Sequence, residues 1–555
     1  MMAGLIFKSI RGLSWARRGL PFCALALILT SCTTLQHEKT AIIPTWSRFE
    51  QTFHSKIAYT NALQEAAVTV IFTSPFGITN RVDGFWDGED VWRVRFSPNA
   101  PGRWTYRTYC SDSTNASLHG QTGNFLCSGA LGVNQFQVHG PVRVSSDHHH
   151  FEHADGRAFL WIADCAWTGG LMAEPKDWEG YAAVRASQGF SAVQWSPAPG
   201  PDNKGDTAFS GKERISINPE FFRRMDARVD MLNSAGLLSV ISPLGTTEPP
   251  DADALPADQL ELLLRYEVAR WGANDVAWLL TFDGEQAPGG GDHWKKAGSA
   301  VFGSIPHAPV IVYSGTGPLK LDDFRKESWV DVFGYGTGQV LDAAARQRLI
   351  DIPRQEWTQT PARPLLNVAP PFENGINVRD GKSIDSETVR RIAWQSLLLA
   401  PAAGTSYGAQ GVAYWDTSME PTDPKASIGG TPLWESSLFL TGAKQMEIVS
   451  KVMNSLDFWQ LVPSPQNVLT PAVAVSPAHQ IAAAASASRS VGVVYLPGDR
   501  SFEFALNALP QAPVIHWTNV RTGVESPAVA VVAEDRCQFP TPEAGDWLLS
   551  YHAGK

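Results

Sequence analysis

Cysteine and charge are both scarce in this chain. Six cysteines occur in 555 residues and no two of them stand in a C-x-x-C spacing, which excludes a disulfide-dense scaffold, a zinc knuckle and a thioredoxin-type centre. Charged residues make up 18% of the chain, the formal net charge is −10, and no long basic run occurs. The chain therefore lacks the positive surface that a nucleic-acid backbone requires, and we expect no nucleic-acid partner.

Metal-ligand spacings and long apolar runs are missing as well. We expect no resident metal and no cofactor, and no stretch reaches the 18 or so apolar residues of a membrane-spanning helix. Abundant instead are aromatic and turn-forming residues, with 20 Trp, 47 Gly and 38 Pro in a chain that is 44% apolar. That composition is typical of a globular protein. Indole rings stack on sugars but also fill cores, so composition alone leaves their role open.

The first residues have the layout of an export signal. Four basic residues between Lys8 and Arg18 precede an apolar run at 20–29, and the sequence Leu-Thr-Ser then ends at Cys32. Because this is the pattern of a bacterial lipobox, we expect residues 1–31 to be removed and Cys32 to carry lipid. The mature protein would then be attached to a bacterial membrane, most naturally the outer membrane, by that lipid alone. An ordinary secretory signal with a chance cysteine and a twin-arginine signal are the alternatives.

Besides the lipid-bearing Cys32, four cysteines remain after the signal is removed. Cys110 and Cys127 flank a polar, turn-rich stretch between two strand-like runs, so a disulfide between them is expected in an oxidising compartment. Cys165 and Cys537 lie in different segments and are expected to be buried thiols.

The chain divides into three parts behind a linker at 32–45. Residues 46–144 read as short strands with period-two alternation, for instance at 67–72, 91–96 and 103–108, and predict a β-sandwich. Residues 458–555 again contain short strand-like segments and predict a second sandwich. The alanine-rich run 482–487 is expected to be a loop or an edge strand.

Residues 145–457 alternate between strands and helices. The strands are expected at 158–163, 191–196, 237–243, 276–282, 310–314, 330–334, 364–369 and 412–415. The helices are expected at 175–188, 218–235, 255–271, 339–351, 385–399 and 441–454. Eight alternations over this length predict a (β/α)8 TIM barrel, so the fold class is α/β with a sandwich on either side. A doubly wound sheet is the structural rival, but no glycine-rich phosphate loop follows the first strand.

In such barrels the active groups gather at the carboxyl ends of the strands. Asp283 follows the fourth strand and Glu373 follows the seventh. Two carboxylates are what glycoside cleavage needs, so we assign Asp283 as general acid/base and Glu373 as nucleophile or base. Glu285 is the alternative acid, and Asp283 could instead cap the next turn or pair with a neighbouring charge.

Aromatic and polar residues near the same strand ends are candidate sugar ligands. They are Asp164, Trp167, Gln194, Trp195, Tyr335, Asn367, Tyr407, Gln410 and Trp415. Trp195 and Trp415 fit barrel packing equally well. The histidines at 148–150 and His153 are expected to form a solvated connector, with chelation of a divalent ion as the lesser alternative.

Several longer motifs resemble a bacterial family of glycosidase-like barrels. The sandwich motifs are Phe-Thr-Ser-Pro-Phe-Gly at 72–77, Gly-Phe-Trp-Asp-Gly at 84–88 and Phe-Ser-Pro-Asn-Ala-Pro-Gly-Arg-Trp at 96–104. Residues 155–167 resemble the opening of the apiosidase-like barrel, and 189–194, 442–446 and 458–463 extend the match. The motifs at 494–497, 519–523 and 545–547 are similar to the small C-terminal sandwich of the same proteins.

This resemblance implies an enzyme that releases apiose-linked sugars from pectin. The family uses an aspartate after strand four, matched here by Asp283, and a glutamate in a strand-seven pattern Glu-Pro-x-Tyr/Phe-Glu. Here the pattern begins with Ala369 and ends with Glu373, so the first glutamate is absent and only Glu373 could replace it. We therefore expect a lipid-anchored glycoside hydrolase acting on polysaccharide side chains. The alternative is a catalytically silent glycan-binding lipoprotein.

Overall fold

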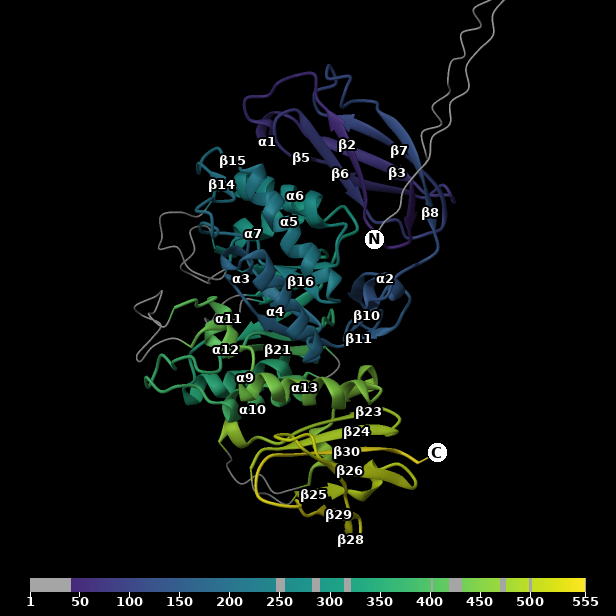
Figure 1. Ribbon diagram of the computed structural model, residues 1–555. Coiled ribbons are helices and arrows are strands. Elements are labelled where there is room, and N and C mark those ends of the chain that lie inside the picture. Colours follow the sequence, from purple (N-terminus) through teal and green to yellow (C-terminus); the bar gives the residue numbers. More distant parts are fainter. Residues whose placement is uncertain are drawn as a thin grey trace, which may run out of the picture. The chain divides into compact units, whose positions relative to one another are not determined.

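The computed structural model describes residues 41–245, 255–281, 290–313, 321–400, 403–418, 432–469, 476–498 and 502–554. Its first part contains two facing β-sheets, drawn in purple and blue in Figure 1. The five-stranded sheet has the order β1 (Ile42–Pro44), β8 (Thr122–Ser128), β7 (Gly102–Cys110), β3 (Val68–Thr73) and β4 (Thr79–Asp83). The three-stranded sheet has the order β2 (Phe49–His54), β6 (Val91–Phe96) and β5 (Phe85–Trp86). The short helix α1 (Ala62–Glu65) also belongs to this part.

Alternation creates the core of this sandwich. In β3, Val68, Val70 and Phe72 are buried while the residues between them are partly exposed, so one face of the strand packs inward. Phe72 stacks on Phe96 of the opposite sheet with ring centroids 4.2 Å apart. The period-two pattern in the sequence therefore predicted the buried face correctly.

The predicted disulfide between Cys110 and Cys127 is wrong. The two cysteines lie on neighbouring strands, but Cys127 pairs with Gly102 at the start of β7 and Cys110 is the last residue of that strand. Eight residues at about 3.3 Å each separate their positions along the strand, far beyond the reach of a disulfide. Both are free, buried thiols, and Cys165 and Cys537 are free and buried as predicted.

A connecting segment leads into the barrel. It contains α2 (Gln135–His139) and a three-stranded sheet of β9 (Val142–Val144), β10 (Phe151–His153) and β11 (Ala158–Phe159). Eight parallel strands then form the central sheet. In chain order they are β12 (Trp161–Cys165), β13 (Ala192–Trp195), β16 (Leu238–Ile241), β17 (Val276–Thr281), β18 (Val310–Tyr313), β19 (Val332–Gly336), β20 (Leu365–Ala369) and β21 (Gly404–Gly408).

The pairing order runs from β20 back through β12 to β21, and an isolated parallel bridge between Glu373 and Ala409 joins the two ends. The strands thus form a nearly closed barrel, and the predicted α/β fold class with β-rich flanks is confirmed. The eighth strand is earlier than expected, because residues 412–415 fall in and after the short helix α11 (Gln410–Ala413) rather than in a strand.

Helices cover the outside of the barrel. They are α3 (Gly169–Met172), α4 (Pro175–Ser187), α5 (Pro219–Ser234), α6 (Ala257–Trp271), α7 (Gly290–Phe302), α8 (Leu321–Phe324), α9 (Ala343–Glu356), α10 (Ser386–Leu399), α12 (Trp434–Ser437) and α13 (Thr441–Asn454). A hairpin of β14 (Phe209–Ser210) and β15 (Ser216–Ile217) precedes α5. Caps define several starts: Asn218, Asp342 and Asp385 accept backbone N–H groups at the first turns of α5, α9 and α10.

An ionic network joins the N-terminal sandwich to α5 and α6. Asp226 of α5 accepts from Arg95 of the sandwich at 2.8 and 3.0 Å and from Arg270 of α6 at 2.8 Å. Arg270 also donates to Asp87 of the sandwich at 3.0 Å, and its guanidinium lies 4.8 Å from the ring centroid of Phe85. Because Arg270 is fully buried, the ion pairs between the sandwich and these helices are shielded from solvent, as in a protein interior.

The C-terminal part is a second pair of sheets. The larger has the order β22 (Leu461–Pro463), β23 (Ala482–Ser486), β24 (Val491–Leu496), β30 (Trp547–Ala553), β26 (Pro513–Asn519) and β27 (Glu525–Pro527). The smaller has the order β25 (Phe502–Ala505), β29 (Arg536–Phe539) and β28 (Val531–Ala533). Short 3-10 turns accompany them: η2 (Phe458–Gln460), η3 (Pro465–Asn467), η4 (Pro477–His479) and η5 (Leu506–Ala508).

The alanine-rich run is neither a loop nor an edge. It forms β23, which lies between β22 and β24, is buried along its whole length and packs against α10. Small side chains let the helix approach the sheet closely. In the described residues, no helix has both the length and the apolar character needed to cross a membrane.

Candidate active site

Side chains of the barrel strands alternate between the lumen and the helix layer. Trp161, Ala163, Leu238, Val240 and Leu366 belong to one apolar cluster, which fills the lumen. Their sequence neighbours, such as Ile162 and Leu365, belong to a separate cluster shared with the helices. A residue near a strand end can therefore reach a substrate at the barrel mouth only if it has the lumen phase.

Two predicted sugar ligands have this phase. Trp167, just after β12, packs in the lumen cluster and is 7% exposed. Gln194 at the end of β13 is held from two sides: its amide nitrogen donates to the carbonyl of Val368 at 2.8 Å, and its oxygen accepts from Ser406 at 3.0 Å. Gln194 thus ties three strands together inside the lumen.

Three aromatic residues of the lumen side were missed by sequence reasoning. Tyr313 ends β18 and Phe372 follows β20, and both belong to the lumen cluster, against which Tyr414 also packs. Tyr313 shares the lumen face with Ile311, because residues two positions apart on a strand point to the same side. That spacing could have identified Tyr313. Phe372 and Tyr414 contact each other edge to face with ring centroids 6.1 Å apart, and no periodicity indicated that pair.

Glu373, predicted as nucleophile or base, has the opposite phase, and its side chain is bonded on the helix side of the barrel. Its carboxylate accepts the hydroxyl of Tyr407 at 2.6 Å and the backbone N–H of Gly442 at 2.9 Å. Gly442 lies in the first turn of α13, and Glu373 is only 4% exposed. Burial raises the pKa of Glu373, although the Tyr407 hydroxyl and the Gly442 N–H act to lower it. The residue therefore fastens the β20 loop to β21 and α13.

Asp164 and Tyr407, predicted to bind sugar, belong to the same buried layer. Asp164 accepts from Arg185 of α4 at 2.6 Å and from Tyr181 at 2.7 Å, and both Asp164 and Arg185 are fully buried. The Arg185 guanidinium lies 5.9 Å from the ring centroid of Tyr407. Burial raises the pKa of Tyr407 well above its usual value. These side chains support the mouth from behind and do not line it.

Four other predicted ligands are also packed outside the lumen. Trp195 is fully buried and donates to Ser239 at 2.8 Å, whereas Trp415 stacks on Trp434 with ring centroids 4.4 Å apart. Asn367 is fully buried and donates to Ser396 of α10 at 3.1 Å. Tyr335 is fully buried in the cluster shared with the helices. The structure therefore packs these four side chains against the helix layer and not in the lumen.

Gln410 is 4% exposed and lies beside the loop after β20, with its backbone N–H bonded to the carbonyl of Glu373 at 3.0 Å. Asp283, Glu285 and Cys32 lie outside the described residues. Ala369, which replaces the first glutamate of the family's strand-seven pattern, packs against the lumen cluster and is partly exposed. An alanine thus occupies a lumen-side position at the end of β20.

The eighth barrel strand contains a serine motif. Residues 404–408 read Gly-Thr-Ser-Tyr-Gly, which fits the G-x-S-x-G pattern of hydrolase nucleophile elbows. That elbow is a sharp turn between a strand and a helix, whereas here the five residues are the strand β21 itself. Ser406 is buried and donates to Gln194, so it supports the lumen as a structural group.

The histidine-rich segment is a packed connector. His149 stacks on Trp357 with ring centroids 4.2 Å apart, and the ring of His153 bonds the carbonyl of Gly140 at 2.7 Å. Within the described ranges, no group of three or more His, Cys, Asp or Glu side chains is arranged to hold a metal ion.

Comparison with known families supports this architecture. The family model described as "Apiosidase-like, catalytic domain" matches residues 145–460, and a domain of unknown function, DUF5060, matches residues 42–111. No curated protein matches the chain.

Solved structures show the same fold at low identity. A protein described as a glycoside hydrolase is 14% identical, with a TM-score of 0.67, over 76% of this chain and 99% of its own. A putative glycoside hydrolase from Bacteroides vulgatus is 17% identical, with a TM-score of 0.66, over 92% of this chain and 99% of its own. A family 5 glycoside hydrolase from the same organism is 15% identical, with a TM-score of 0.65, over 76% and 94%.

Proposed function

Because this chain belongs to the family of apiosidase-like catalytic domains, we propose that it is a glycoside hydrolase acting on side chains of pectin-type polysaccharides. The observation that carries the proposal is the match of the family model to the whole barrel. The lumen side chains near the mouth agree with it, since the aromatic rings of Trp167 and Tyr313 lie at the carboxyl ends of β12 and β18. Such groups suit a saccharide.

Asp283 is the proposed general acid/base. It follows the last residue of β17 by two positions in the chain, and the carboxyl ends of barrel strands are where catalytic groups collect in this fold. A carboxylic acid at that place would protonate the leaving oxygen of the glycosidic bond.

A second candidate function has a specific observation in its favour. Glu373 is bonded on the helix side of the barrel, and the lumen-side position at 369 holds an alanine. If the second carboxylate of the family stands at 369, this chain has kept the cleft and lost the residue. It would then bind the glycan without cleaving it.

One set of three proteins distinguishes the two candidates. The full chain is prepared with Cys32→Ser, so that no lipid is attached, and compared with the same chain carrying Asp283→Asn or Ala369→Glu. Product release is followed on pectic oligosaccharides, and binding is followed on the same panel by calorimetry. The hydrolase proposal expects release by the parent and a fall of at least about 100-fold with Asp283→Asn, while binding persists.

The binding candidate expects a different pattern. The parent binds but releases nothing, and Ala369→Glu gains measurable release because it supplies the missing carboxylate. Equal release by the parent and Asp283→Asn would refute the assigned acid. The absence of both binding and release on the panel would refute both candidates for this class of glycan.

We also propose that Cys32 is diacylated and that the mature chain is attached to a bacterial membrane, the outer one in a Gram-negative cell. The support is the basic, apolar and Leu-Thr-Ser-Cys layout of residues 8–32. Mass spectrometry of the N-terminal peptide should show Cys32 as the first residue with added lipid. Recovery of the Cys32→Ser protein in the same membrane fraction would contradict the proposal.

A further inference from the structure

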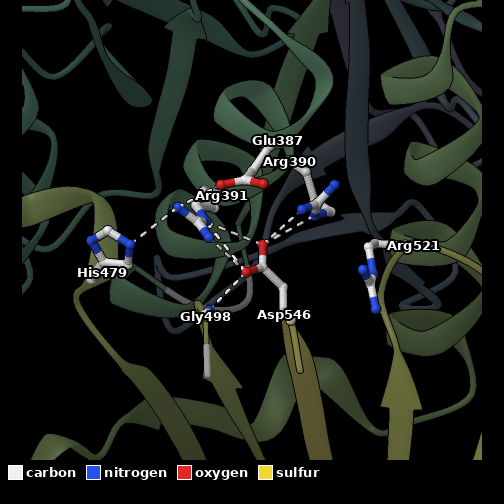
Figure 2. A pocket seen from close by; sticks show the side chains of 8 residues that line it. Glu387, Arg390, Arg391, His479, Gly498, Arg521 and Asp546 are labelled. Atoms are coloured by element: carbon white, nitrogen blue, oxygen red, sulfur yellow. Dashed lines mark hydrogen bonds and ion pairs between the residues drawn. The ribbon is translucent and has the colours of Figure 1, made fainter. Parts of the chain in front are cut away.

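A polar cavity of about 310 Å³ lies where α10 meets the C-terminal sandwich (Figure 2). Its lining comes from one end of α10, from η4 and from three turns of the sandwich. Every described residue that lines it is charged, a histidine or a glycine. This excludes an apolar ligand and favours one with charge and hydroxyl groups.

Asp546 organises the cavity. Its carboxylate accepts from Arg390 at 2.8 Å, from Arg391 at 2.9 Å and from the backbone N–H of Gly498 at 2.7 Å. Tyr495 adds a fourth donor at 3.0 Å. With 1% of its side chain exposed, Asp546 holds both guanidinium groups in fixed orientations, as the dashed lines in Figure 2 show. The arginines are therefore ordered before any ligand arrives.

Positive charge exceeds negative charge in the lining. Arg521 joins Arg390 and Arg391, against two carboxylates, those of Asp546 and Glu387. Arg521 is 40% exposed, and its Nη2 lies 3.4 Å from Glu543 and 3.2 Å from the carbonyl of Ala544. A guanidinium has five N–H donors in a fork that fits a carboxylate, so Arg521 can accept an anionic ligand without breaking a strong bond.

Two glycines keep the space open. At Gly545, with φ +125°, a Cβ would meet the Arg521 guanidinium at 2.8 Å. At Gly498, with φ +83°, a Cβ would lie 3.4 Å from the ring of His479, a polar group of the cavity wall. A side chain at Gly545 would therefore press on Arg521, whereas one at Gly498 would reach van der Waals contact with His479. The opposite wall offers Glu387, which is 53% exposed.

From this arrangement we propose that the cavity binds a single sugar residue that carries a carboxylate, that is, a sugar acid. Its carboxylate would pair with Arg521, and its hydroxyls would bond Glu387, whose carboxylate Arg391 already holds at 2.8 Å. The volume is at the small end for ligand sites and suits one ring. The cavity is built on α10, outside the barrel lumen, so it retains an acidic glycan at a place separate from the lumen.

Calorimetric titration of the full chain carrying Cys32→Ser tests the proposal. The probes are glucuronate, glucose and sulfate at constant ionic strength. We expect glucuronate to bind and glucose not to, and Arg521→Gln to weaken glucuronate binding at least about tenfold because a charge-assisted pair is lost. Arg536→Gln is the matched control, since Arg536 is similarly exposed, pairs with Glu503 at 2.9 Å and does not line the cavity.

Several results would overturn the proposal. They are no binding of glucuronate, equal binding by Arg521→Gln and the parent at an unchanged unfolding midpoint, or equal affinity for glucose. Sulfate that binds as tightly as glucuronate would show a plain oxyanion site and refute the sugar acid. Unchanged glucuronate affinity in Asp283→Asn is expected, so failure here and failure of the hydrolase proposal are separable.

Discussion

Replacement of Glu373 tests whether this carboxylate supports the barrel or performs chemistry. In Glu373→Ala the buried Tyr407 hydroxyl and Gly442 N–H both lose their acceptor. A buried unsatisfied donor costs about 1–3 kcal/mol, and removal of one member of a buried charged contact costs about 3–5 kcal/mol, so we expect about 3–5 kcal/mol. Glu373→Gln keeps one oxygen but turns amide hydrogens toward the Gly442 N–H, and we expect about 1–3 kcal/mol.

Differential scanning calorimetry provides the measurement. In a domain as large as this barrel, a destabilisation of 1 kcal/mol lowers Tm by about 2 °C. The Tm of Glu373→Ala should therefore fall by about 6–10 °C, and that of Glu373→Gln by about 2–6 °C. Glu447→Gln is the matched control, because Glu447 lies exposed on the same helix α13. Its Tm should not change. Tyr407→Phe should also destabilise, and the double variant should lose less than the sum of the two single effects.

A catalytic role would produce the reverse pattern. A nucleophile replaced by its amide loses at least about 10³-fold in kcat with little change in stability. An unchanged Tm for Glu373→Gln together with such a loss of product release would refute the structural role. The Tm measurement requires no substrate, so it decides the point even for a protein that only binds glycans.

Three further predictions concern the flanking regions. Asp226→Ala should lower the free energy of unfolding by about 3–5 kcal/mol in urea titrations, because two buried guanidinium groups lose their shared carboxylate; an effect under about 1 kcal/mol would contradict the described network. Burial acts to raise the pKa of Asp546, but Arg391 and Arg390 together lower it to about 2, below the usual 3.8. The stabilisation from Asp546 should therefore be complete above about pH 4 and disappear as pH falls toward 2, so the Tm gap between the parent and Asp546→Asn should close over that interval. The last prediction concerns the cysteines of the Cys32→Ser chain made without its first 31 residues. After denaturation without reductant, a thiol reagent should titrate four thiols. A count of two would show that a disulfide is present after all.

The sequence was sufficient for the architecture because the signals were strong and local. The capped helices α5 and α10 were predicted within one residue. By contrast, α9 was placed four to five residues too early, and α7 was not predicted. The first seven barrel strands were predicted within about three residues, since each is a short apolar run between helices. The eighth was misplaced because β21 contains glycine, threonine and serine, whereas Val412 and its neighbours look more like a strand.

The direction of the site residues could not be read in the same way. Barrel strands are buried on both faces, so Trp161 in the lumen and Ile162 in the helix layer are equally apolar. The hydrophobic pattern of such a strand therefore does not show which residues point into the lumen. A shift of one residue exchanges the two faces. Glu373 and Asn367 were therefore expected at the mouth, while Tyr313 with the correct phase was overlooked. The cysteine pair failed for a related reason, since neighbouring strands were recognised but their register was not.

The contact through Arg270 has a practical consequence for anyone who wishes to work with a smaller protein. An excised barrel that begins near residue 145 would leave this arginine without Asp87 and without the ring of Phe85. Trimming at the other end would uncover the α10 surface on which β23 lies. Shortened versions should therefore be poorly soluble, and variants for biochemistry are better designed by point substitution than by truncation.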